Sequence, residues 1–165
     1  MRAWYAGRGG PDDPWRIGLA ESTDGVAFTK HPSNPVLVEG EAGDSDESGL
    51  TAPAVLHERG LYRIWYEERG FFDTTTIGYA VSTDGVSWHK YPGNPVVTPE
   101  DVGLEAVRAP SVARVGGRLV MAVSQDHGIG SSRIYGLINQ VVEAQEQIGH
   151  AAASWPRAGQ YARPK

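Results

Sequence analysis

Three acidic residues lie at the edges of short apolar runs, where their carboxylates could do chemistry. Asp46 and Glu105 occupy corresponding polar segments, each a few residues before an Ala-Pro pair. Glu67 directly follows the run that contains Trp65-Tyr66. A positioned carboxylate can act as a general acid, a general base or a nucleophile. These three residues are therefore the first candidates for a catalytic role.

Basic and polar side chains accompany these carboxylates. Arg69 follows Glu67 closely, and Arg108 directly precedes the second Ala-Pro pair. An arginine in such a place could clamp a carboxylate or a hydroxyl group. Asp126 and His127 stand next to each other, and such a pair could handle a proton.

Each of these residues also has a structural interpretation. The acidic segment around Asp46 could be a solvated loop, and Glu105 could form an ordinary surface pair with Arg108. The Asp-His pair precedes Gly-Ile-Gly and could be a loop tip. Glu67 could form an ion pair with Arg69. The other copies of the repeat described next carry no acid at the position of Glu67, however, which favours a functional role there.

An internal repeat positions these residues. Residues 17–36 and 77–96 are identical at 13 of 20 positions, with an offset of 60. A weaker third copy follows at an offset of 57, in which Ala52-Pro53 returns as Ala109-Pro110. Repeats of this length are typical of solenoids and propellers.

One repeat unit reads as four antiparallel strands. Alternating apolar residues and turn residues predict strands at 54–57, 62–67, 76–82 and 86–90. The loop 69–75 joins the second strand to the third. Asp84-Gly85 forms the next turn, because Asp-Gly supplies the positive φ of a tight hairpin. We assign Asp84 and its counterpart Asp24 to these turns rather than to catalysis.

Four antiparallel strands in series are typical of a propeller blade. The predicted fold is all-β: a β-propeller fragment of about two and a half four-stranded blades, over residues 1–137. The blades cover about 4–50, 51–107 and 108–137, and the first copy begins at its second strand. Residues 138–165 leave the repeat; a short helix is expected over 141–153 and disorder from 154 onward. Missing blades or a second chain would then close the ring.

Composition and charge argue against several classes of function. The 165 residues carry a formal net charge of -5 and no basic run, which argues against nucleic-acid binding. The chain has no cysteine and no apolar stretch of membrane-spanning length. Its histidines show no metal-ligand spacing, so neither a metal nor another cofactor is expected. The segment Met1–Tyr5 lacks signal-peptide features, which leans toward the cytoplasm without deciding the compartment.

The repeat motif also resembles a known family. The pattern Tyr-x-x-Trp-Tyr, then Ile-Gly-x-Ala-x-Ser-x-Asp-Gly-x-x-Trp, then Lys-x-Pro-x-Asn-Pro-Val is similar to the five-bladed propeller glycoside hydrolases. That superfamily includes arabinanases, xylosidases, invertases, levansucrases and mannosyl-phosphorylases. The resemblance covers residues 4–137.

The resemblance implies hydrolysis of glycosidic bonds in an oligosaccharide or polysaccharide, at the mouth of a central channel. Two carboxylates would flank the bond, one as acid and the other as base or nucleophile. The catalytic candidates are Asp46, Glu67 and Glu105. The candidates for contacting the carbohydrate are Arg69, Phe71, Phe72, Arg108, Asp126 and His127, with the two phenylalanines stacking on a sugar ring.

The sequence departs from the family pattern at two places. Relatives often carry an Asp directly before the proline of the first strand, where this chain has Ala52 and Ala109. Neither alanine can transfer a proton. A carbohydrate-binding or truncated propeller without catalysis is therefore one alternative, and a glycoside phosphorylase that uses Arg69 and Arg108 for phosphate is another.

Overall fold

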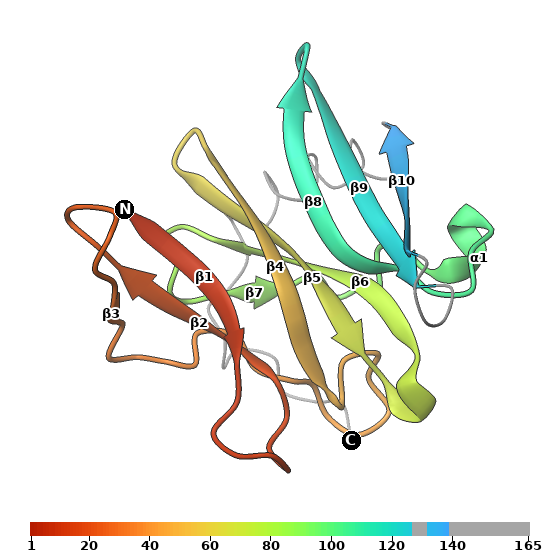
Figure 1. The fold of residues 1–165 in the computed structure, drawn as a ribbon, viewed down its shortest axis with the longest axis horizontal. Helices are drawn as coiled ribbons and strands as arrows, with labels where there is room; N and C mark the ends of the chain where they lie inside the picture. Colours follow the sequence, from red (N-terminus) through yellow and green to blue (C-terminus); the bar gives the residue numbers. More distant parts are fainter. Residues whose placement is uncertain (127–131, 139–165) are drawn as a thin grey trace, which may run out of the picture.

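The computed structural model describes residues 1–126 and 132–138, and it forms three antiparallel sheets (Figure 1). The first sheet contains β1 (Arg2–Gly7), β2 (Arg16–Glu21) and β3 (Thr29–Lys30). The second contains β4 (Gly49–Glu58), β5 (Leu61–Arg69), β6 (Thr75–Ser82) and β7 (His89–Lys90). The third contains β8 (Arg108–Val115), β9 (Arg118–Asp126) and β10 (Ser132–Ile138). No helix in the described ranges is long and apolar enough to cross a membrane.

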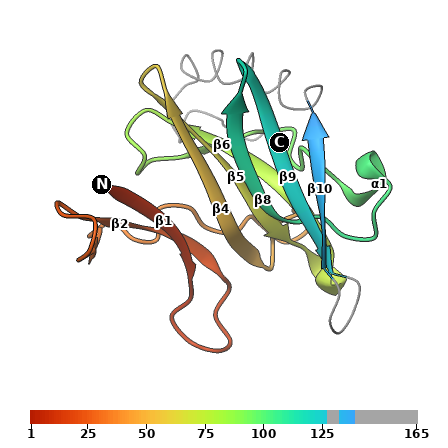
Figure 2. The ribbon, with the colours of Figure 1, turned by 45° about the horizontal axis from the view of Figure 1, so that its top comes forward.

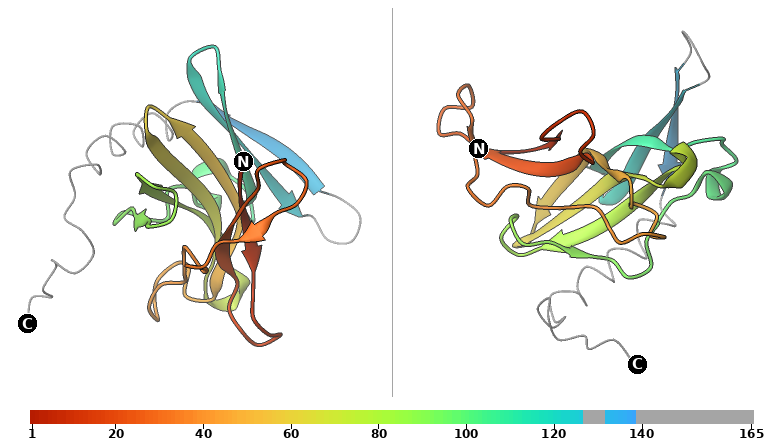
Figure 3. Two further views of the ribbon diagram at one scale, coloured as in Figure 1. Left: turned by 90° about the vertical axis from the view of Figure 1, so that its left-hand side faces the viewer. Right: turned by 90° about the horizontal axis from the view of Figure 1, so that it is seen from below.

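The sheets follow one another as the repeat predicts. Their innermost strands β1, β4 and β8 lie side by side, and the sheets fan out from them (Figures 2 and 3). The second sheet has the full order β4-β5-β6-β7, with every neighbouring pair antiparallel. The predicted four-stranded unit is therefore confirmed.

Side chains of β5 alternate between two hydrophobic cores. Ile64 and Tyr66 pack with Ile17 of the first sheet. Trp65 packs with Met121 of the third sheet. All of these side chains are fully buried. Burial of one large apolar side chain stabilises the folded state by about 1.5–3 kcal/mol. The central sheet is thus apolar on both faces, because each face packs against a neighbouring sheet.

The Ser-Thr-Asp-Gly turn explains why the fourth strand is shorter than predicted. The Asp84 carboxylate accepts hydrogen bonds from the backbone amides of Val86 and Ser87, both at 2.7 Å. Since these amides are occupied within the turn, strand pairing starts only at His89–Lys90. Gly85 has a φ of 76°, as the predicted turn requires.

The same turn joins two sheets. The Trp4 indole N–H of the first sheet donates to the carbonyl of Gly85 at 2.9 Å, and the Arg2 guanidinium donates to the carbonyl of Asp84 at 2.5 Å. Trp4 also packs edge-on against Trp88. Trp4 and Trp88 therefore pack between the first two sheets.

Two short helical segments were not expected from the sequence. The single turn η1 (Phe71–Asp73) lies between β5 and β6, and α1 (Pro99–Val102) lies before β8. Thr98 and Asp101 cap α1 reciprocally, which stabilises so short a turn. The predicted tail helix over 141–153 and the predicted disorder from 154 lie outside the described residues.

Strand β4 starts at Gly49, earlier than predicted. A bulge divides it, and the part after the bulge begins at Ala54, where the strand was predicted to begin. Its pairing with β5 shifts register between Thr51 and Ala54. Within the bulge Ala52 has a φ of 47°, and Ala109 adopts the same value in the corresponding bulge of β8. Left-handed backbone is unfavourable for alanine, by about 1–2 kcal/mol per residue.

This strain gives a first prediction. Ala52→Gly should raise the free energy of unfolding by about 0.5 kcal/mol, because relief of the left-handed alanine exceeds the extra unfolded-state entropy of glycine, about 0.4–1 kcal/mol. Urea denaturation measures the difference. The control Ala54→Gly, in the regular part of β4, should lower the free energy of unfolding by about 0.5–1 kcal/mol. Equal losses in both variants would contradict the argument.

The Asp24-Gly25 turn of the first sheet gives a second prediction. Backbone hydrogen bonds from Val26 and Ala27, with one from the Ser22 hydroxyl, lower the pKa of Asp24 from 3.8 to about 2. A carboxyl with a lowered pKa stabilises the fold above its ordinary pKa, and this stabilisation is lost as the pH falls from 3.8 toward 2. NMR titration of the carboxyl carbon should locate this pKa. A midpoint near 3.8 would show that the turn is open in solution.

Candidate functional site

Glu67 lies near the end of β5, at the junction with the third sheet. It is buried, and one of its oxygens accepts a hydrogen bond from the backbone amide of Ala109 at 3.1 Å. The other oxygen lies 3.6 Å from Arg69 Nε and 3.9 Å from Arg108 Nη1. The structure therefore brings together three residues that the sequence selected: Glu67, Arg69 and Arg108.

These ion pairs leave hydrogen-bonding capacity unused. Distances of 3.6 and 3.9 Å are too long for hydrogen bonds. The Nε atoms of Arg69 and Arg108 are both buried, and neither has a hydrogen-bond partner in the described part of the chain. Unpartnered buried donors are rare and call for a physical reason. Two arginines that pair with one carboxylate therefore keep unused donors, and a change of side-chain conformation would let these donors bind hydroxyl or anionic oxygens of a ligand.

Aromatic side chains follow directly in the chain. The exposed fractions of Phe71 and Phe72 are 66% and 90%, and their rings meet edge to face with centroids 4.4 Å apart. Asp73 completes this turn and lies 3.9 Å from Arg69. Large apolar side chains so exposed could stack on a flat ligand surface.

Asp46 has different neighbours. It is buried in the loop before β4, and its carboxylate forms an ion pair with the Lys90 ammonium of β7. A pocket of about 510 Å³ is lined by both residues and by Glu68. Adjacent side chains of a strand point to opposite faces, so Glu68 lies on the face toward the first sheet while Glu67 faces the third. Asp46 and Glu67 therefore belong to separate clusters.

Glu68 is a residue that sequence analysis missed. Burial raises the pKa of its carboxyl above the ordinary 4.5, opposed by hydrogen bonds from Ser45 and Thr76 and assisted by the charge of Asp46. The Thr76 hydroxyl donates to Oε2 at 2.9 Å, whereas Oε1 has no partner among the described residues. A signal was present: the corresponding residue of the first repeat is Gly7, so the acid at position 68 breaks the repeat.

The remaining candidates stand apart from both clusters. Glu105 is exposed and forms no hydrogen bond or ion pair within the described ranges. Asp126 ends β9, but its side chain lies outside the described residues, as does all of His127. Among the residues that the structure describes, no group of three His, Asp or Glu is placed to hold a metal ion.

Known proteins resemble this chain over most of its length. Two uncharacterized proteins of Mycobacterium tuberculosis, MT1551 and Rv1502, are each 30% identical to it over 132 residues, which make up 76% of this chain and 42% of each relative. The chain thus spans less than half the length of these relatives. No protein-family model matches it.

Solved structures decide the fold. The Bombyx mori GH32 beta-fructofuranosidase BmSUC1 superimposes on 84% of this chain with a TM-score of 0.61 and 17% identity, over 31% of its own length. The fold is that of part of a glycoside hydrolase-type β-propeller. A thermostable family-43 glycoside hydrolase also covers 84% of the chain, with a TM-score of 0.61, 20% identity and 55% of its own length. The beta-1,2-mannobiose phosphorylase of Listeria innocua covers 75%, with a TM-score of 0.57, 17% identity and 33% of its own length. The three sheets are therefore propeller blades.

The buried carboxyl between the first two blades gives a third prediction. A carboxyl whose pKa is raised by folding binds its proton more tightly in the native state, so stability falls as the pH rises above 4.5. Glu68→Gln should remove this decline and give a higher urea midpoint than the wild type at pH 8. Glu58→Gln is the control, because the hydrogen bond from Arg114 lowers the pKa of Glu58 instead of raising it, and this variant should leave the decline in place. An unchanged pH dependence in Glu68→Gln would refute the assignment.

Proposed function

We propose that this chain is a carbohydrate-binding part of a glycoside-active propeller, and that Glu67, Arg69 and Arg108 contact the sugar. The observation that carries the proposal is the pairing of two arginines with one carboxylate, in which each arginine keeps a buried Nε that has no hydrogen-bond partner in the described residues. Sugar hydroxyls both donate and accept hydrogen bonds, so they match donors and an acceptor placed side by side. Phe71 and Phe72 would offer a stacking surface next to these groups.

Binding is favoured over a complete catalytic centre in this part of the propeller. Hydrolysis needs two carboxyl groups about 5–10 Å apart on either side of one bond. Glu67 is held by an amide and two arginines, Asp46 is paired with Lys90, and Glu105 is exposed in a separate loop. In a complete propeller, hydrolysis by a carboxylate pair drawn from Asp46, Glu67 and Glu105 is the expectation that the family resemblance supplies.

A glycoside phosphorylase is the second candidate. The free Nε donors of Arg69 and Arg108 suit phosphate oxygens as well as hydroxyls, since arginine binds both in a fork geometry. The mannobiose phosphorylase among the structural neighbours has the same fold. Phosphate-dependent cleavage of a mannoside would favour this alternative over simple binding.

Calorimetry with arabino-, xylo-, fructo- and manno-oligosaccharides tests the proposal. At least one of these should bind, and Arg108→Lys should weaken that binding about tenfold, because a ligand hydrogen bond to a charged group is worth about 1.5–3 kcal/mol. The same titrations with phosphate present distinguish the phosphorylase.

A matched ion pair provides the control. Glu58 and Arg114 join the same two blades at the other ends of β4 and β8, with Arg114 Nε 2.7 Å from Glu58 Oε1. Glu58→Gln removes a similar pair away from the proposed site and should leave sugar affinity unchanged. Equal loss of affinity in Glu58→Gln and Arg108→Lys would mean that blade packing, not ligand contact, is being measured.

A further inference from the structure

An acidic pocket lies on the face of the second blade that carries Glu68. Its volume is about 510 Å³. Among the residues that line it, three carry a carboxyl group and one carries an ammonium group: Asp44, Asp46, Glu68 and Lys90. Pockets of roughly 300–1,000 Å³ are typical of small-ligand sites. The size of this pocket and its excess of acids therefore suit a small cation.

Lys90 shows which kind of cation the pocket accepts. Its ammonium forms an ion pair with the buried carboxylate of Asp46. Neither Asp44 nor Glu68 takes part in an ion pair within the described residues. An ammonium group has three N–H donors and no acceptor, so carboxylate oxygens are suitable partners for it. A second ammonium, supplied by a ligand, would match the carboxyl groups that Lys90 leaves without a cation.

Glu68 is the clearest of these unmatched groups. It is 1% exposed, and its Oε2 accepts a hydrogen bond from the Thr76 hydroxyl at 2.9 Å, whereas Oε1 has no partner in the described part of the chain. A buried polar atom without a partner is costly. Oε1 lies against Gly78, where a Cβ atom would come within 2.2 Å of it. Because the last torsion of a glutamate is broad, rotation of the carboxyl group lets a ligand in the pocket reach this oxygen.

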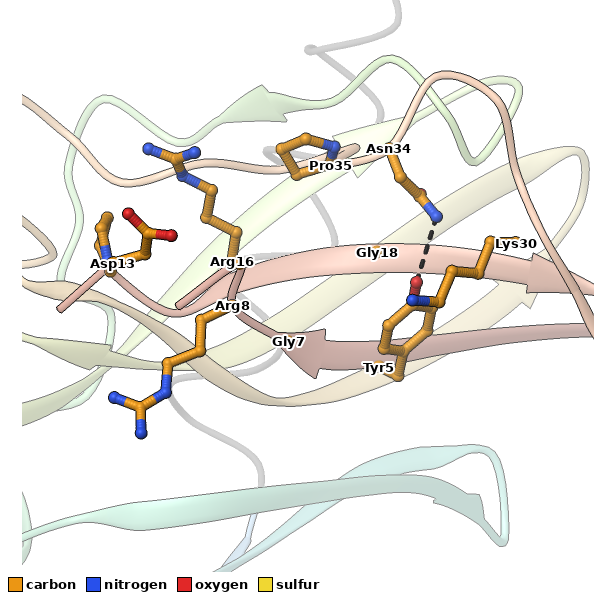
Figure 4. Close-up of a pocket in the computed structure, with 11 residues that line it drawn as sticks. Tyr5, Gly7, Arg8, Asp13, Arg16, Gly18, Lys30, Asn34 and Pro35 are labelled. Carbon is orange, nitrogen blue, oxygen red and sulfur yellow. Dashed lines mark hydrogen bonds between the residues drawn. The ribbon is translucent and has the colours of Figure 1, made fainter. Parts of the chain in front are cut away.

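The first blade shows that the acid at this position is not needed for the repeat to fold. Its pocket in the corresponding place is lined differently, and Gly7 stands there at the position of Glu68 (Figure 4). The Asn34 side chain nevertheless donates to the Tyr5 hydroxyl at 3.2 Å, as the corresponding pair does in the second blade. Asp13 is the only acid among the described residues that line this first pocket. The carboxyl groups of the second pocket are therefore an addition to a common framework.

We propose that the pocket of the second blade binds the primary ammonium group of a small ligand, which pairs with Glu68 beside the Lys90–Asp46 ion pair. The described residues contain no group of three His, Asp or Glu placed to hold a metal ion, so the matching cation is organic. An amino sugar and an aliphatic amine both carry such a group. The proposal does not rest on the sugar site at Glu67, which lies on the opposite face of β5.

Calorimetry at neutral pH with glucosamine, N-acetylglucosamine and butylamine tests the proposal. Glucosamine should bind, whereas N-acetylglucosamine should not, because acetylation removes the ammonium group. Tighter binding of glucosamine than of butylamine would identify an amino sugar as the ligand, and equal affinities would identify a primary amine of any kind. Glu68→Gln should weaken binding about tenfold, as expected for the loss of one charge-assisted hydrogen bond.

Lys90→Gln separates ligand contact from packing, because it should have the opposite effect. It leaves the buried Asp46 carboxylate without its cation, so the ligand ammonium should bind about tenfold more tightly. Asp13→Asn, in the pocket of the first blade, is the matched control and should leave the affinity unchanged. Thermal unfolding checks that each variant is folded. Absence of amine binding at millimolar concentration, equal binding of N-acetylglucosamine, or weaker binding in both Glu68→Gln and Lys90→Gln would overturn the proposal.

Discussion

The structure depends on the burial of both faces of the central blade. Alternate side chains of β5 enter two different cores, so each neighbouring sheet is needed to cover one face. A single four-stranded sheet with two apolar faces would expose far more apolar surface than a soluble domain tolerates. Stability in this fold is therefore a property of pairs of blades, as in other repeat proteins, where interfaces between units contribute much of the free energy.

The same alternation organises the polar groups. Where the apolar part of β5 ends, two consecutive glutamates continue the strand, and each enters the interface that its position dictates. Glu67 meets arginines from its own strand and from the next blade. Glu68 meets the loop that crosses from the preceding blade. The two glutamates thus carry a buried charged group into each interface at the end of β5, where the strand leaves the cores.

Much of the fold could be predicted from the repeat, because recurring turns and alternation depend on local chemistry. The Asp-Gly turns and the four-strand unit both followed from that pattern. The bulge at Ala52 could not be predicted, since it arises from pairing between β4 and β5 rather than from local preference. The position of the candidate site was only partly accessible. Glu67 and Arg108 were selected, but Glu68 was overlooked although its acid breaks the repeat, and its burial, which raises its pKa, is a tertiary property that the sequence does not show.

The left-handed alanines have a further consequence. Among residues other than glycine, Asp and Asn are enriched in this backbone conformation, whereas alanine gains nothing from it. Two blades nevertheless keep the conformation at the same point of the innermost strand. The main chain there is shaped independently of its side chain, by the bulge and the following proline. An exchange of side chain at either position would thus change the chemistry at the start of the innermost strand without any rebuilding of the scaffold, so these two sites can evolve new side chains at little structural cost.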